Sequence, residues 1–242
     1  DTSITATNWW GANPSGTYTL GLQAPNVTLN VDISTNGQLI FSNISSLSGS
    51  STISSPATTI NLVSDFILSQ INFNQSVSFL SPTQNVNSVT ISNSGFTNAF
   101  TLNMPINGPL ALTNVSIGGA LSITASGSLT ATTLSNVDVN GSATISVGSG
   151  SLTLNNVTAN NGLSLMSNGA GPVALHAVEA NGGLTVTAPG ESVAFQNGTF
   201  MGATNSITAG NITMGDSSGN NVPDFNTSST TLNASSSVFM PV

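Results

Sequence analysis

The fold of this chain is decided by the phrase LTNVSIGGALSI, residues 112–123, because the phrase returns along the sequence. It recurs as LSNVDVNGSATI at 134–145, LNNVTANNGLSL at 154–165, LHAVEANGGLTV at 175–186, and more loosely at 195–207. We call the first residue of each copy its anchor. The anchors are 22, 20, 21 and 20 residues apart and are Leu112, Leu134, Leu154, Leu175 and Phe195. A period of this length indicates a stack of short structural repeats.

Weaker matches extend the repeat toward both ends of the chain. Ile91 and Leu68 begin earlier copies, Phe41 begins a looser one, and Met214 belongs to the last. We therefore expect an N-terminal cap or exchanged segment over 1–38, the repeat domain over 39–215, and a C-terminal cap or exchanged segment over 216–242.

Apolar and polar residues alternate within each copy, which is the pattern of half-buried strands rather than helices. In the first copy the pairs Leu110/Leu112, Val115/Ile117 and Leu121/Ile123 predict three short strands. Asn and Gly lie between the strands, at 118–119, 140–141 and 160–162 for example, and suit tight bends. The pattern predicts an all-β fold, a right-handed parallel β-helix with about 20–22 residues per coil and non-repeating terminal segments.

Stacked coils place equivalent residues about 4.8 Å apart in parallel strands, so each repeat position becomes a column. One inward core column is predicted to hold Leu68, Ile91, Leu112, Leu134, Leu154, Leu175 and Phe195. Two residues after the anchor stand Asn114, Asn136, Asn156, then Ala177, then Asn197. We expect these asparagines to form a structural ladder of amide hydrogen bonds, the alternative being that Asn only suits the bend.

The phrases LTLNNV (152–157) and GLTVTA (183–188), set among Asn-Gly and Ser-Gly turns, resemble coils of two β-helix families. These are the filamentous-haemagglutinin-type proteins and the autotransporter passengers. The resemblance covers roughly residues 39–214 and rests on the repeated order of short strands and turns that stacked coils share. It implies a secreted surface protein that adheres to other cells or builds fibres.

Composition excludes several classes of function. The chain has 242 residues, no Lys or Arg, eight acidic residues and one histidine. Nucleic acid is therefore not expected as a partner, because phosphate binding depends on those cations. No apolar stretch approaches the roughly 18 residues of a membrane span. The chain has no cysteine and begins at Asp1, and we expect an extracellular or cell-surface protein after removal of a signal peptide.

Candidate chemistry is sparse, and neither an enzyme, a cofactor nor a metal is expected. Asp138 and Glu179 fall four positions after their anchors, two coils apart on one outward column, about 9.6 Å from each other. Glycosidases use two carboxylates about 5 to 9.5 Å apart, so a glycoside hydrolase is a less favoured alternative. A row of hydroxyls on the third strand could order water, as ice-binding solenoids do, dock another subunit or bear O-glycans, and it could equally be a soluble β-face. The row comprises Ser78, Thr101, Ser122, Thr144, Ser164 and Thr185.

The ends of the chain favour assembly, because an open solenoid exposes strand edges and core unless they are covered. The assembly candidates, which lie outside the repeat, are Trp9, Trp10, Tyr18, Val238 and Phe239. We therefore expect an extracellular structural protein that polymerises with itself, head to tail, as a filament, sheath or surface fibre. The alternative is a glycan- or host-binding adhesin, with glycans as the partner.

Overall fold

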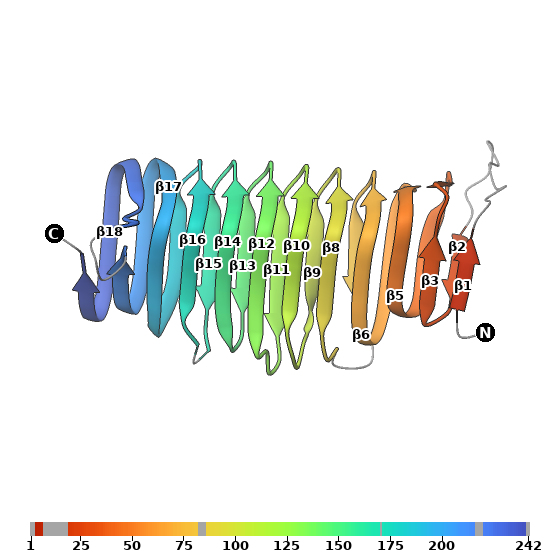
Figure 1. Ribbon diagram of the computed structural model, residues 1–242, viewed down its shortest axis with the longest axis horizontal. Helices are drawn as coiled ribbons and strands as arrows, with labels where there is room; N and C mark the ends of the chain where they lie inside the picture. The colour runs from red at the N-terminus through yellow and green to blue at the C-terminus, as the bar shows by residue number, and fades with distance from the viewer. Residues whose placement is uncertain (1–2, 7–18, 82–85, 170, 216–219, 241–242) are drawn as a thin grey trace.

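The computed structural model describes residues 3–6, 19–81, 86–169, 171–215 and 220–240. These residues form an elongated stack of coils, with the first and the last described residues at opposite ends of the long axis (Figure 1). The protein is a parallel β-solenoid of about 10 turns. Among the described residues, no helix could cross a lipid bilayer.

Strands make up each coil, and each strand pairs in parallel with its equivalents one coil away (Figure 1). The strands of the N-terminal half are β1 (Ser3–Ala6), β2 (Thr19–Gln23), β3 (Asn26–Leu29), β4 (Ile33–Ser34), β5 (Gln38–Ser54), β6 (Ala57–Phe73), β7 (Val77–Leu80), β8 (Val89–Phe96) and β9 (Phe100–Pro105). Those of the C-terminal half are β10 (Leu110–Ile117), β11 (Leu121–Ser126), β12 (Ala131–Val139), β13 (Ala143–Val147), β14 (Ser151–Ala159), β15 (Leu163–Ser167), β16 (Val173–Ala180), β17 (Leu184–Met214) and β18 (Asp224–Phe239).

The central coils consist of one long and one short strand, where the sequence predicted three. β10 contains both predicted strands around Leu112 and Val115, and β11 is the third. The chain bends within β10 at Asn114, whose φ is 54°. Residues on either side of the bend keep their partners in β12, so one residue in the left-handed region turns the strand without ending its pairing.

The register follows the predicted columns. Leu112 pairs with Leu134, Leu134 with Leu154, Leu154 with Leu175, and Leu175 with Phe195. On the other side Leu112 pairs with Ile91, and Ile91 with Leu68. All seven side chains are 0% exposed. The shared core therefore runs along the axis of the stack, as repeat architectures require.

Aromatic rings cluster in this core at the end of the N-terminal half, in strands β6 to β9. Phe96 lies 4.7 Å from Phe100 and 5.3 Å from Phe73, measured between ring centroids. Phe79 also contacts Phe100, at 5.2 Å. Phe73 and Phe79 belong to one coil, and Phe96 and Phe100 to the next, so the Phe73–Phe96 and Phe79–Phe100 contacts join two coils.

The two terminal segments depart from the repeat phrase, yet their described parts continue the stack. β2, β3 and β4 pair in parallel with β5, and Val27 and Leu29 are buried. At the other end β18 pairs in parallel with β17 over most of its length. Parallel stacking requires only that apolar residues alternate, so a segment can form a coil without repeating the phrase.

Candidate functional site

A left-handed residue occupies the same corner of successive coils. The positive φ values along this corner belong to Gln70 (59°), Asn93 (48°), Asn114 (54°), Asn136 (54°), Asn156 (54°), Ala177 (51°) and Asn197 (54°). Asn43 also has a positive φ (59°) but lies at a different corner, because Phe41 pairs with Ile60, and Ile60 with Phe79, in the column of the short strands. Asparagine visits this region more readily than other residues with a Cβ, because its short polar side chain bonds locally. The corner therefore favours asparagine before any contact between coils is counted.

Hydrogen bonds also join the asparagines of this corner to one another. The Asn114 amide donates to Oδ1 of Asn93 at 3.0 Å, and Asn136 donates to Asn114 at 2.9 Å. Asn156 continues the series by donating to Asn136 at 2.9 Å. We call Asn93, Asn114, Asn136 and Asn156 the corner ladder. Ala177 separates it from Asn197, which keeps the backbone conformation but stands apart from these bonds.

A second series of polar contacts follows the other end of the same outer strand face, and sequence reasoning missed it. Asn181 donates to Oδ1 of Asn160 at 2.9 Å, and Asn160 to Asn140 at 3.5 Å. On the far side of Gly118, Asn74 donates to Ser54 at 2.9 Å. The available signal was an asparagine before the glycine bend of three successive coils, at Asn140, Asn160 and Asn181.

Between these two series lies an outward column in which one member has no side chain. Successive coils supply Asn72, Gly95, Ser116, Asp138 and Thr158, paired one with the next. Glu179 pairs with Thr158, so Asp138 and Glu179 lie two coils apart on one column. Two intervals of strand spacing put them about 9.6 Å apart.

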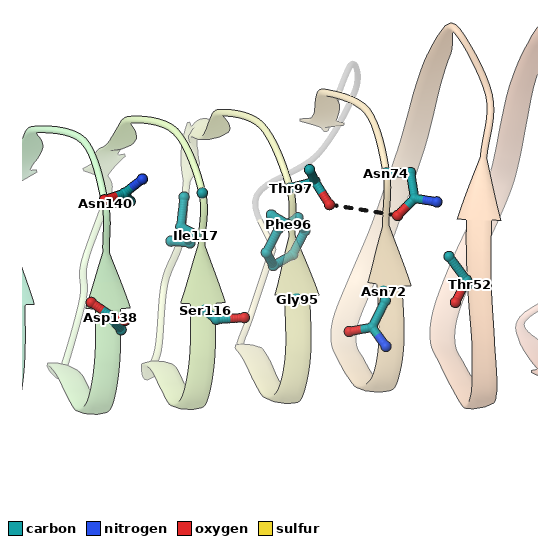
Figure 2. A pocket seen from close by; sticks show the side chains of 11 residues that line it. Thr52, Asn72, Asn74, Gly95, Phe96, Thr97, Ser116, Ile117, Asp138 and Asn140 are labelled. Atoms are coloured by element: carbon teal, nitrogen blue, oxygen red, sulfur yellow. Dashed lines mark hydrogen bonds between the residues drawn. The ribbon is translucent and has the colours of Figure 1, made fainter.

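The missing side chain at Gly95 opens a groove on this face (Figure 2). Its volume is about 490 Å³, and its lining includes Asn72, Asn74, Ser116, Asp138 and Asn140. A Cβ built on Gly95 would lie 2.6 Å from Oδ1 of Asn72 and 3.2 Å from Oγ of Ser116. Both oxygens therefore lean over Gly95, and Figure 2 shows them pointing toward it from the coils on either side.

The polar groups of the groove are available to a ligand. Within the described residues, no hydrogen bond forms on the side chains of Asn72, Ser116 or Asp138, and all three are exposed. Asn140 accepts from Asn160 through Oδ1, and among the described groups none accepts from its Nδ2. The corner-ladder asparagines, by contrast, are joined to one another.

Neither the histidine nor the acidic residues form a metal centre in the described part of the chain. His176 is half-buried on the outward side of β16, where it pairs with Asn155 of β14 and Gln196 of β17. The described residues contain no group of three His, Cys, Asp or Glu side chains that could hold a metal ion. The chain has neither lysine nor arginine, so the groove faces no permanent side-chain cation.

The other predicted positions are placed as follows. The hydroxyl row is aligned by the pairs Ser78 with Thr101, Thr101 with Ser122, Ser122 with Thr144, Thr144 with Ser164, and Ser164 with Thr185. A neighbouring outward row contains Ser146, Met166 and Thr187, and the apolar side chain of Met166 is 43% exposed. Trp9, Trp10 and Tyr18 lie outside the described residues. Val238 and Phe239 are 43% and 48% exposed on β18.

The fold and these surfaces define a parallel β-solenoid with a polar outer groove and exposed apolar side chains on its last described coil. No protein-family model, curated protein or solved structure matches the chain.

Proposed function

We propose that this protein is a non-enzymatic extracellular structural protein whose copies stack end to end into a filament, sheath or surface fibre. The observation that supports the proposal most directly is the incomplete burial of coil β18. Its core-facing residues pair with fully buried residues of β17, yet they themselves are partly exposed.

The contrast between β17 and β18 is clear at each core position. Phe200 and Ile207 are 0% exposed, whereas their partners Phe225 and Leu232 are only partly buried. Ile212 is 0% exposed, and its partner Val238 is 43% exposed. The side chains of β18 therefore present an apolar cross-section of the core on the side away from β17. Covering such a surface is favourable, at about 25 cal/mol per Å² of apolar area.

The backbone of β18 supports the same proposal. Among the described strands, only β17 pairs with β18, so one edge of β18 is open to a further parallel strand. Open edges pair readily with other chains. A second copy of this chain is the occupant we propose, because a coil of the same solenoid matches both the outline of the core and the strand spacing. A contact between two different ends does not close on itself, and so produces a filament.

Charge does not oppose this contact. Eight acidic residues are distributed over the whole chain, and their repulsion is screened within about 8 to 10 Å at physiological salt. Without lysine or arginine, assembly would depend on backbone hydrogen bonds and apolar contact rather than on ion pairs. The likeness of the coils to those of filamentous-haemagglutinin-type and autotransporter β-helices supports an extracellular location.

Electron microscopy and light scattering of the purified chain over a concentration series test the proposal. We expect filaments as wide as one solenoid, whose length grows with concentration. The variant carrying Val238→Glu and Phe239→Glu should assemble at least tenfold less readily, because Val238 pairs with the buried Ile212 and its new charge would be buried at the contact.

The matched control replaces two exposed apolar side chains far from β18, by Ile67→Glu and Met166→Glu; these are 49% and 43% exposed. This control should assemble like the unmodified chain. The proposal is wrong if the unmodified chain stays monomeric at high concentration, or if the β18 variant assembles as well as the control does.

A further inference from the structure

We propose that the groove over Gly95 binds an extended neutral glycan. This inference does not depend on the proposed assembly, because the groove lies on the outer face of the stack and is lined by residues of the central coils. It rests on the two missing side chains that shape the groove, on the unpaired polar atoms around it, and on the charge of the chain.

Two adjacent outward columns each lack one side chain, because a glycine occupies the position. The two glycines, Gly95 and Gly118, lie on neighbouring coils. Gly95 interrupts the column of Asn72, Ser116 and Asp138, and Gly118 interrupts the column of Asn74, Thr97 and Asn140. A Cβ at Gly118 would lie 2.2 Å from the carbonyl oxygen of Thr97, so this position accommodates no side chain. The result is a hollow about 490 Å³ in volume, within the usual range of ligand sites.

The hollow continues on the other side of the column. A second groove of about 290 Å³ lies toward the corner ladder and shares Asn72, Ser116 and Asp138 with the first. These three side chains can therefore contact a ligand from two sides. Together the grooves cross several coils, which follow one another about every 4.8 Å. An extended polymer lying along the axis would meet an equivalent set of positions at each coil.

The polar atoms of the groove match sugar hydroxyls, which both donate and accept hydrogen bonds. Asp138 and Oδ1 of Asn72 offer acceptors, Nδ2 of Asn140 offers a donor, and the Ser116 hydroxyl does both. These groups are not used elsewhere in the described structure, so a ligand would not have to displace internal bonds. Phe96 lies beneath the groove but is 1% exposed, so recognition would rest on hydrogen bonds.

The negative charge of the protein favours neutral over acidic glycans. Among the described residues, the only ionisable group lining the groove is the Asp138 carboxyl, and the chain as a whole has a formal net charge of −8. An acidic polysaccharide would meet repulsion and would find no lysine or arginine to pair with. A neutral polysaccharide meets neither penalty. The site therefore favours chains of unmodified hexoses over uronates or sulfated sugars.

Native affinity electrophoresis tests this inference, because the acidic protein migrates on its own charge. Gels containing dextran, mannan or a soluble β-glucan serve as neutral probes, and alginate serves as the acidic one. We expect at least one neutral probe to retard the protein, with alginate having no effect. Gly95→Thr should weaken the retardation at least fivefold, because the new side chain fills the hollow and displaces the flexible end of Asn72.

A second pair of variants separates binding from folding. Asp138→Ala and Glu179→Ala each remove one exposed carboxylate from the same outward column, but only Asp138 lines the groove. We expect Asp138→Ala to weaken binding at least threefold and Glu179→Ala to leave it unchanged, with equal melting temperatures. Equal retardation of all four proteins, or retardation by none of the neutral probes, would overturn the inference.

Discussion

The side-chain amide of Asn136 donates a hydrogen bond of 2.9 Å to Oδ1 of Asn114, one coil away along the corner ladder. Asn136 also accepts a bond of 2.9 Å from Asn156, so a single side chain ties three coils together. The same residue holds its own backbone at a φ of 54°. One residue type thus meets a local and a tertiary requirement at the same position.

Replacing Asn136 by Ala should destabilise the central coils. Two ladder bonds are lost, and alanine is less favourable in the left-handed region, so we expect a loss of about 1 to 3 kcal/mol. Chemical unfolding followed by circular dichroism measures the change. Asn155→Ala, at an exposed position outside the ladder, is the control and should change the stability by less than about 0.5 kcal/mol. Equal effects of the two substitutions would argue against a stabilising ladder.

One coil beyond the corner ladder, an asparagine can be added rather than removed. Ala177 holds a φ of 51° between Asn156 and Asn197, so Ala177→Asn would place an amide where the ladder is interrupted. We expect a gain of about 0.5 to 1.5 kcal/mol from new amide bonds and from the better fit of asparagine to this backbone. Ala174→Asn, outside the ladder, is the comparison. A melting temperature that does not rise for Ala177→Asn would contradict this prediction.

Thr132 offers a test of the core. Its Oγ1 is buried and has no hydrogen-bond partner among the described residues, at a core position that pairs with Leu110 and Leu152. Thr132→Val keeps the shape and removes the unsatisfied hydroxyl, so we expect a stabilisation of about 1 kcal/mol. Thr133→Val alters the adjacent, partly exposed residue and should have little effect. Thermal unfolding compares the two, and a loss of stability for Thr132→Val would show that the hydroxyl does have a partner.

The anchor column predicts where a charge cannot be tolerated. Leu154 is 0% exposed between Leu134 and Leu175, and Leu154→Asp would bury an unpaired carboxylate. We expect a loss of several kcal/mol and disruption of the middle coils. Thr153→Asp, on the outward side of the same strand, should remain folded. Limited proteolysis with a protease that cleaves at apolar residues distinguishes the two, and equal resistance would be evidence against the register.

Binding of a glycan should not lead to its cleavage. Asp138 and Glu179 share a column, but Thr158 lies between them and only Asp138 lines the groove over Gly95. We expect no new reducing ends when neutral or acidic polysaccharides are incubated with the purified protein. Activity that disappears in Glu179→Gln would show instead that the two carboxylates act as a catalytic pair.

The sequence by itself determined the solenoid, and its register and inward columns from Leu68 to Phe195. Phe41, which was predicted to begin an earlier copy, instead pairs with Ile60 in the column of Phe79. A phrase that returns every 20 to 22 residues leaves few alternatives, because each copy buries its apolar face only by stacking on the next. Leu112, Leu134 and Leu154 could thus be aligned by counting. The corner asparagines were visible for the same reason, since a repeated left-handed bend selects asparagine locally.

Only the tertiary structure decided what the outer surface offers. The groove depends on Gly95 and Gly118, which are neighbours across coils although they belong to different columns and look like ordinary bend residues in the sequence. The partial exposure of Phe225 and Leu232 likewise depends on what stacks beyond β18. Alternation along one coil fixes which way each side chain points, but a hollow or an open edge arises from the side chains of adjacent coils. Contacts of that kind have no local signal in the sequence.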